Sequence, residues 1–381
     1  MRSHVYESID ELGLHQIEAL DAGLDFSFGL LRAIERTLWG ELLVRYVTVE
    51  SDDGGEVLAF TPVYVGSNLN FNALLPKVIQ RGYNALVRSL GTAMATRVAV
   101  IGCLISDRGW IPMRPSLTER RAALRLMLGE IDRVAKEHSA QLGMLKDIHC
   151  DFPAEERALM REAGFVEGFS LPTTRINTAY ESFEEYLKKG LSKNGRRLAS
   201  KRFKKAEGNL TMSVFEDFEH LIPRVFPLYR AVFLKAKYQF EELPPRFYLE
   251  CSRSTSPKTE MVLCESSDGR LVGSMLIFYN DDEQTNRRIG LDYDYEDHAL
   301  IYNLLLYTGI ERAIERGIKT VWLGQSSYIP KTRLGGELEE QYLLLKAYDP
   351  VLKPTLPLQR WWMSRYSAAH TRAGLEKGVS I

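Results

Sequence analysis

Residues 290–336 read GLDYDYEDHALIYNLLLYTGIERAIERGIKTVWLGQSSYIPKTRLGG, and this stretch carries the pattern that decides the fold. Between 300 and 316 the apolar residues recur at the spacing of one helix face, and Gly317 follows where helices favour a glycine just past their end. Runs rich in aliphatic and aromatic residues flank this helix at 288–295 and 320–323 and are expected to be strands. A strand, a long helix and another strand predict a sheet covered by helices.

The rest of the chain repeats this order in both of its halves. Each half is expected to hold a helix, a β-hairpin, a third strand, a long helix and a last strand, and the first hairpin turns at Ser-Asp-Asp-Gly-Gly, residues 51–55. The expected helices are 28–39, 118–138, 154–162, 183–205 and 216–234, and the expected strands are 42–50, 56–65, 97–105, 141–148, 260–265 and 271–279. The pattern predicts an α/β fold with mixed sheets in two domains, 1–172 and 173–381, with Pro172 at the boundary.

Length and composition agree with two globular domains. The chain has 381 residues, of which 45% are hydrophobic and 26% are charged. Its formal net charge of -1 excludes a globally basic protein but not a local basic patch, and we expect no DNA partner. Its cysteines show neither a CxxC pair nor metal-ligand spacing, so we expect no metal and a reducing compartment; they are Cys103, Cys150, Cys251 and Cys264. The sequence has no signal-peptide pattern and no long apolar run, which predicts a cytoplasmic protein without a transmembrane segment.

Two regions carry a resemblance to a known family. The first is the quoted stretch, with Tyr302 in its helix, Gly317 after the helix, then Leu-Gly-Gln-Ser-Ser-Tyr (323–328), Lys331 and Leu-Gly-Gly (334–336). The second is residues 171–208, with SFEEYL followed by LSKNGRRLASKRFKKAEG. Together they resemble the tandem acetyltransferase-fold (GNAT) group that includes the FemAB-like peptidoglycan aminoacyltransferases.

The resemblance implies two tandem GNAT-like domains, with the active site in the second. Members of this group transfer an acyl group from a coenzyme A thioester, or an aminoacyl group from transfer RNA, to an amine. One departure concerns the donor, because the glycine-rich pyrophosphate loop of simple acetyltransferases is absent from this sequence. That absence puts coenzyme A binding by the usual loop in doubt.

Acyl transfer to an amine needs a base for the amine proton and donors for the developing oxyanion. Asp292 and Asp294 alternate with larger side chains, so a strand would place both carboxylates on one face, where they could act as the base or bind an ammonium. The alternative is the solvated face of an edge strand.

Lys331 is expected in a loop that Pro330 and the following glycines shape. Its ammonium is a candidate for polarising the acyl carbonyl or binding phosphate, and Arg333 would add a bidentate phosphate contact. Tyr328 and Tyr302 are further candidates, although tyrosine in such segments is more often packed in the core. The alternative for Lys331 and Arg333 is a surface hairpin.

Residues 188–205 hold many cations and no acid. On a helix, Lys193, Arg197 and Lys201 would form one cationic stripe, with Arg196 beside it, which suits the phosphates of coenzyme A, of a nucleotide-linked acceptor or of transfer RNA. The alternative is an ordinary solvated face.

Three hypotheses follow. The leading one is an N-acyltransferase, of the class that includes the N-acetyltransferases. It would use acyl-coenzyme A as donor and an amine as acceptor. The second is a transfer-RNA-dependent aminoacyltransferase that acts on a cell-wall precursor or a small metabolite. The third is a non-catalytic module that binds anionic ligands.

Overall fold

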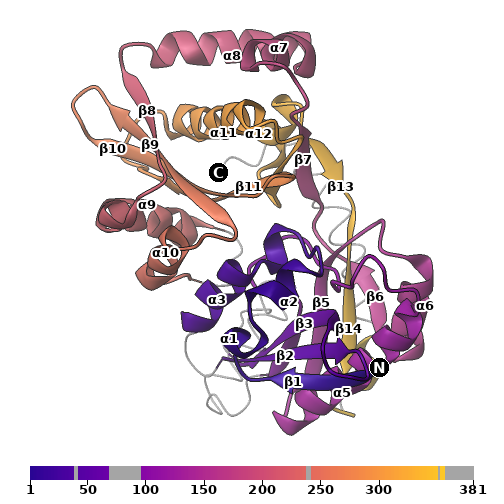
Figure 1. Cartoon of the computed structure of the whole chain (residues 1–381). Coiled ribbons are helices and arrows are strands. Elements are labelled where there is room, and N and C mark those ends of the chain that lie inside the picture. Colours follow the sequence, from indigo (N-terminus) through magenta and orange to yellow (C-terminus); the bar gives the residue numbers. More distant parts are fainter. Residues whose placement is uncertain (38–41, 68–95, 237–241, 351, 357–381) are drawn as a thin grey trace. The chain divides into compact units, whose positions relative to one another are not determined.

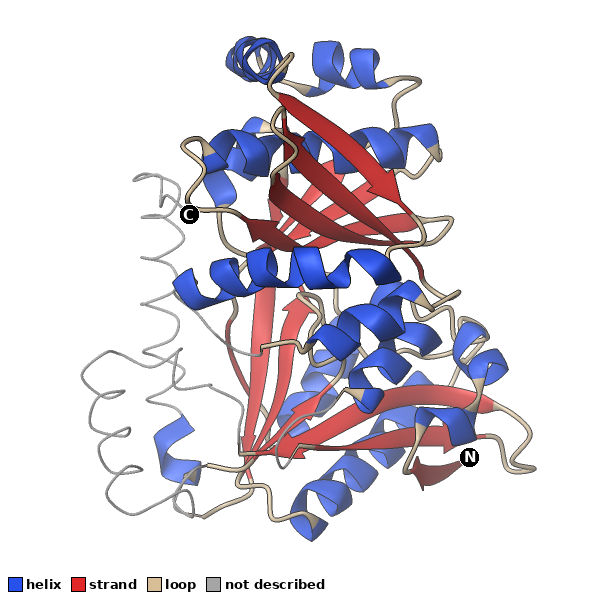
Figure 2. Ribbon diagram, turned by 90° about the vertical axis from the view of Figure 1, so that its left-hand side faces the viewer, coloured by secondary structure: helices blue, strands red, loops and turns tan. Residues whose placement is uncertain are grey.

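The computed structural model describes residues 1–37, 42–67, 96–236, 242–350 and 352–356. They form two compact units: the first comprises Met1–Leu171 and the described residues from Glu340 onward, and the second comprises the described residues from Pro172 to Glu339. Each unit holds a sheet with packed helices (Figures 1 and 2). No helix in the described ranges is long and apolar enough to cross a membrane.

The sheet of the first unit has the strand order β1-β2-β3-β4-β5-β14-β6. Its strands are β1 (Arg2–Tyr6), β2 (Leu43–Glu50), β3 (Val57–Gly66), β4 (Val98–Ile101), β5 (Leu142–His149), β6 (Val166–Phe169) and β14 (Gln341–Ala347). Its α-helices are α1 (Ile9–Leu12), α2 (Leu14–Glu18), α3 (Phe28–Arg36), α5 (Arg120–Glu137) and α6 (Ala154–Glu162). The buried face of α5 packs on this sheet through Leu124, Met127 and Ile131.

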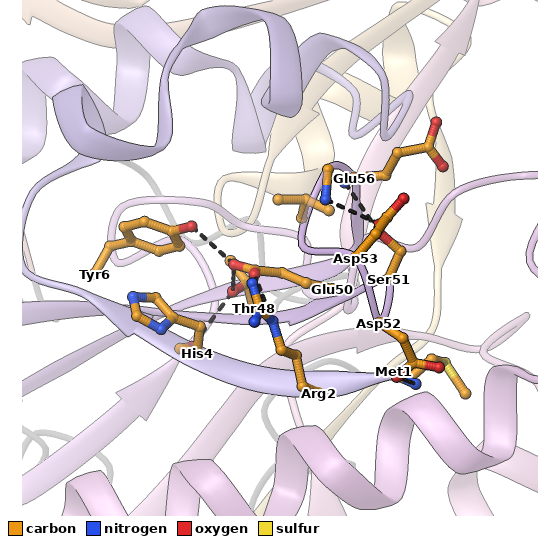
Figure 3. Close-up of polar contacts among 12 residues, drawn as sticks. Met1, Arg2, His4, Tyr6, Thr48, Glu50, Ser51, Asp52, Asp53 and Glu56 are labelled. Carbon is orange, nitrogen blue, oxygen red and sulfur yellow. Dashed lines mark hydrogen bonds and ion pairs between the residues drawn. The ribbon is translucent and has the colours of Figure 1, made fainter.

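Strand β1 has no counterpart among the sequence predictions, and polar contacts help to hold it at the sheet edge (Figure 3). Tyr6 donates a 2.8 Å hydrogen bond to the buried carboxylate of Glu50 on β2, and the Thr48 hydroxyl donates to the same oxygen at 3.1 Å. Burial and the Glu50 carboxylate raise the pKa of Tyr6 to about 12. Because Glu50 accepts hydrogen bonds from both strands, these side-chain contacts help to hold β1 against β2. The hydrophobic periodicity of the sequence does not predict them.

The sheet of the second unit has the strand order β13-β7-β12-β11-β10-β9-β8. Its strands are β7 (Thr173–Asn177), β8 (Leu210–Phe215), β9 (Lys258–Ser266), β10 (Leu271–Tyr279), β11 (Glu283–Leu291), β12 (Thr320–Gly324) and β13 (Glu337–Glu339). Its α-helices are α7 (Phe183–Glu185), α8 (Lys193–Ala206), α9 (Ile222–Lys235), α10 (Pro245–Ser252), α11 (His298–Glu315) and α12 (Tyr328–Arg333). Helix α11 covers one face of β9, β10 and β11, and α9 covers the other face of β10 and β11 (Figure 1).

The two sheets exchange one strand each. Strand β14 comes from the C-terminal half of the chain, yet it pairs antiparallel with both β5 and β6 in the first sheet. Strand β7 follows β6 in sequence and pairs with β12 and β13 in the second sheet. The expected C-terminal domain, 173–381, is therefore not a single unit, because the described residues from Glu340 onward belong to the first unit.

Several expected elements differ from the structure, and the helix expected at 216–234 begins at Ile222. The helix expected at 183–205 is interrupted: a π-helical turn, Tyr186–Gly190, precedes an extended Leu191, and Ser192 then caps α8 by accepting a 3.1 Å hydrogen bond from the Gly195 amide. The strand expected at 97–105 ends at Ile101, because Gly102 has φ +97°. The strand expected at 288–295 is β11, which begins and ends earlier.

Candidate functional site

The site is built where two parallel strands of the second unit separate. Strands β11 and β12 pair only through Glu283–Thr285 and Thr320–Trp322, although β11 continues to Leu291 and β12 to Gly324. Their following loops, 292–297 and 325–327, leave the sheet at the same edge, which we call the carboxyl edge. In open α/β sheets this is the place where ligands bind.

A β-bulge lies on β11 just where it leaves β12. The register with β10 shifts between Leu276↔Arg287 and Ser274↔Gly290, so two residues of β11 face one of β10, and Arg288 has φ +52°. Bulges bend a strand and are frequent beside active sites. The sequence carries no signal for this bulge, because arginine does not favour a positive φ.

The loop after β11 is acidic, and its carboxylates are not on a strand. Asp292 follows the last residue of β11, forms an ion pair with Arg270, and accepts a 3.0 Å hydrogen bond from the Asp294 amide. Asp294 itself is exposed. The predicted alternation of these two carboxylates on one strand face is therefore wrong, because a turn begins at the first of them.

Asp297 closes the N-terminus of α11. Its Oδ1 accepts a 2.9 Å hydrogen bond from the Leu300 amide, and its Oδ2 accepts one of 2.6 Å from the Lys205 ammonium of α8. Burial raises the pKa of Asp297, but these two partners outweigh burial and hold it below its usual value. A carboxylate thus occupies the helix end that usually attracts a phosphate.

Two tyrosines named as candidates lie in the core beside this edge. The hydroxyl of the buried Tyr302 on α11 is hydrogen-bonded to that of Ser327 after β12; burial raises the pKa of Tyr302 more than this bond lowers it. Ser326 and Ser327 both have positive φ, so the contact joins α11 to a tightly turned loop. Tyr328 donates a 2.9 Å hydrogen bond to the Pro172 carbonyl oxygen.

Lys331 is buried rather than presented by a loop. It lies on α12 with 3% of its surface exposed, and its Nζ donates to the carbonyl oxygens of Gly324 at 2.9 Å and Gln325 at 2.8 Å. The loop expected at this position is thus a helix, and the ammonium binds the end of β12. Arg333, at the last residue of α12, is exposed.

Helix α8 carries the predicted cationic stripe. Lys193, Arg196, Arg197 and Lys201 are all exposed, while Ala199 and Ala206 are buried on the opposite face. Arg196 bonds to the carbonyl oxygens of Lys188 and Leu191, and Arg197 to the Asn194 side chain at 3.2 Å. The absence of a Cβ at Gly195 lets α8 approach α12, since a Cβ there would lie 3.0 Å from the Arg333 carbonyl oxygen.

The structure brings together only part of the predicted site. Lys205 of the basic segment reaches the acidic loop at Asp297, and Tyr302 reaches the loop after β12. Asp292 and Lys331 have different partners, an arginine of the β9–β10 turn and backbone carbonyls of β12. The residues that sequence reasoning missed are Lys205 as a loop partner, Asp297 as a cap and Ser327; only Asp297, which directly precedes a helical pattern, carried a usable signal.

Comparisons with known proteins agree with this architecture. The sequence profile of the FemAB-like family, described as peptidoglycan biosynthesis/recognition, matches residues 102–328. The putative 8-amino-7-oxononanoate synthase 2 of Mycobacterium tuberculosis, strains CDC 1551 / Oshkosh and ATCC 25618 / H37Rv, is 27% identical over 249 residues, which are 63% of this chain. The match covers 32% of that relative, so the chain spans about a third of its length.

Solved structures show the same fold. FemX superposes with a TM-score of 0.63 at 11% identity, over 93% of this chain and 100% of FemX. The C-terminal domain of a putative lysylphosphatidylglycerol synthetase from Agrobacterium fabrum gives 0.54 at 12% identity, over 93% and 97%. A tandem GNAT protein from the clavulanic acid biosynthesis pathway gives 0.50 at 12% identity, over 91% and 98%. The prediction of an α/β fold with two tandem GNAT-like domains is confirmed.

Proposed function

This chain belongs to the FemAB-like family, and from that premise we propose that this acyltransferase transfers its acyl group to an amine at the carboxyl edge of β11 and β12. The observation that carries the proposal is the separation of β11 from β12 next to a bulge, with an acidic loop at the edge. An acceptor amine enters as an ammonium ion and must lose a proton before it attacks. The carboxylates of 292–297 supply both the attraction and the base.

Asp294 is the carboxylate that we propose as the base. It is exposed, whereas Asp292 is paired with Arg270 and also accepts the Asp294 amide. Tyr302 stays protonated at neutral pH, because burial raises its pKa, and it orients Ser327 at the other side of the edge. In this proposal Lys331 fixes the end of β12 through the Gly324 and Gln325 carbonyl groups and positions the loop that carries Ser327.

The acyl donor is the finer part of the proposal. A donor of the acyl-coenzyme A type would place its pyrophosphate at the N-terminus of α11, but Asp297 caps that end and Glu296 adds a further negative charge. The exposed cations of α8 offer the alternative site for phosphates. They are spread along an α-helix of 14 residues and are not gathered in a compact loop. This arrangement favours aminoacyl-transfer RNA over acyl-coenzyme A.

A donor comparison tests the function. The purified chain is incubated with a panel of primary amines and either labelled acyl-coenzyme A or transfer RNA charged with a labelled amino acid. We expect amine-dependent transfer from charged transfer RNA. Transfer from acyl-coenzyme A alone would refute the donor assignment, and binding of either donor without any transfer would support the non-catalytic anionic-ligand module.

The Asp294→Asn variant tests the base. Its turnover is expected to fall by about 100-fold or more, because an amide cannot take the proton. Asp281→Asn is the matched control, since Asp281 is also exposed but lies in the turn before β11, away from the carboxyl edge. Equal turnover in the two variants would refute the role of Asp294.

A further inference from the structure

Three consecutive side chains with different metal-ligating atoms gather at the end of β5 in the first unit. Strand β5 ends at His149, and the chain then turns, with the Phe152 amide donating to the His149 carbonyl oxygen at 3.0 Å. Because the chain is no longer extended, His149, Cys150 and Asp151 do not alternate between faces. Their ligating atoms all lie within 4.8 Å of one another.

The separations lie near the edges of a tetrahedral coordination sphere, with the imidazole and the thiol each close to a different oxygen of the Asp151 carboxylate. His149 Nδ1 lies 3.8 Å from Cys150 Sγ and 3.3 Å from Asp151 Oδ2, and Cys150 Sγ lies 3.8 Å from Asp151 Oδ1. Zinc bonds of about 2.1 Å to nitrogen, 2.3 Å to sulfur and 2.0 Å to oxygen give tetrahedral edges of about 3.6 Å between nitrogen and sulfur, 3.4 Å between nitrogen and oxygen, and 3.5 Å between sulfur and oxygen. The imidazole and the thiol lie near different oxygens of Asp151, so a rotation of that exposed carboxylate would bring one oxygen to both and complete the three-ligand set.

The backbone that carries these ligands is held from two sides. Arg157 donates to the Cys150 carbonyl oxygen at 3.0 Å and lies over the Tyr342 ring at 4.6 Å, and the Cys150 amide donates to the Glu340 carbonyl oxygen at 3.1 Å. The Asp151 side chain is 87% exposed, so water has access to a fourth position. Such anchoring limits the entropy that is lost when a metal orders the site.

Cys150 also differs from the other cysteines of the chain. Cys103, Cys251 and Cys264 are buried, and burial raises the pKa of the Cys251 and Cys264 thiols. Cys150 is half-buried and contacts an imidazole. Of the four cysteines it is therefore the one whose sulfur is most accessible to a metal ion.

We propose that His149 Nδ1, Cys150 Sγ and a carboxylate oxygen of Asp151 bind a zinc ion, with water as the fourth ligand. A thiolate and an imidazole select zinc over magnesium or calcium, which prefer oxygen ligands. The ion replaces the 3.3 Å hydrogen bond that the Asp151 amide donates to His149 Nδ1. This site lies in the first unit, and the proposal does not depend on the transfer reaction.

Cobalt titration of the untagged, reduced full chain tests the site. Co²⁺ should bind at one equivalent with a thiolate-to-cobalt charge-transfer band and the strong visible bands of tetrahedral cobalt, and Zn²⁺ should remove both. Cys150→Ser should abolish the charge-transfer band, and His149→Gln should weaken binding by at least about tenfold. His15→Gln is the control, because that histidine is exposed on α2, and it should titrate as the wild type does.

Two results would overturn the proposal. One is a wild-type titration without a charge-transfer band, and the other is a band that survives in Cys150→Ser. Circular dichroism melting curves of each variant without metal establish that it is folded, so that a lost band reports the ligand and not the fold.

Discussion

A buried ion cluster attaches α11 to the sheet of the second unit, and its removal gives a quantitative prediction. Glu260 on β9 is 0% exposed, and Arg312 of α11 donates to both of its carboxylate oxygens, at 2.9 and 3.3 Å. Arg316, just past the end of α11, bonds to the same carboxylate and donates to Gln284 on β11 at 3.2 Å. Glu260→Ala would remove the buried carboxylate that Arg316 and Arg312 share, and Arg312 would keep only its ion pair with the exposed Glu315.

The expected cost follows from the burial of the partners. Arg316 and Arg312 side chains are 16% and 31% exposed, so neither can regain full hydration without moving. Removing one partner of a buried ion pair costs about 3 to 5 kcal/mol. For a unit of this size, about 2 to 4 °C of melting temperature is lost per kcal/mol, so the transition should fall by about 6 to 20 °C.

Differential scanning calorimetry of the full chain measures this shift. Glu265→Ala is the matched control on the same strand, because Glu265 pairs with Arg224 while their side chains are 32% and 48% exposed. An exposed pair contributes about 0 to 1 kcal/mol. If the melting temperatures of the two variants fall by the same amount, the buried cluster stabilises the second unit no more than an exposed ion pair does.

Three further predictions address the donor, the helix cap and the exchanged strands. Replacing Lys193, Arg197 and Lys201 by alanine should weaken transfer-RNA binding and reduce the slope of log K against log salt by about 2 to 3 in filter-binding assays; an unchanged slope would contradict a phosphate role for α8. Above about pH 4, Asp297→Asn should be less stable than the wild type in urea titrations, because the folded-state pKa of Asp297 lies under its unfolded value. This difference should disappear as the pH falls through the folded-state pKa. A difference that does not vary with pH would count against the ion pair. Residues 1–172 expressed alone lack β14 and should show no cooperative unfolding, whereas a sharp calorimetric transition would show that β14 is dispensable.

Much of the fold follows from local patterns. The bounds expected for α6 and β10 agree residue for residue with the structure, and β2, β3, α5 and α11 agree within two residues at each end. These elements have clean periodicity and end at glycine, serine or aspartate turns, such as the 51–55 turn, where Asp53 Oδ1 accepts a 3.1 Å hydrogen bond from the Gly55 amide. Local chemistry fixes such elements, so one sequence is enough to find them.

The candidate site depends on features that are not local. The alternating residues at 291–295 have the pattern of a strand, yet pairing of β11 stops at Leu291, and no residue beyond it alternates between faces. The sequence around Lys331 is typical of a solvent-exposed loop, but the carbonyl groups at the end of β12 lie close enough to accept hydrogen bonds from its buried ammonium. Periodicity predicts which residues of a strand share a face, but it does not predict where the strand ends. The sequence therefore identified the candidate residues without predicting their geometry.

The two units build the same strand framework and differ at the edge where a ligand would bind. In the first unit, parallel pairing of β4 with β5 ends at Ile101 and Leu145, and the chain from Gly102 then returns to β5: the Gly109 amide donates to the Asp147 carbonyl oxygen at 2.7 Å. A Cβ on Gly109 would lie 2.0 Å from the Lys146 carbonyl oxygen, so this segment lies directly against the strand. The chain itself thus occupies the side of β5 that its parallel neighbour has left. In the second unit the corresponding edge instead presents the acidic loop 292–297, and this difference supports our proposal that the transfer chemistry lies in that unit.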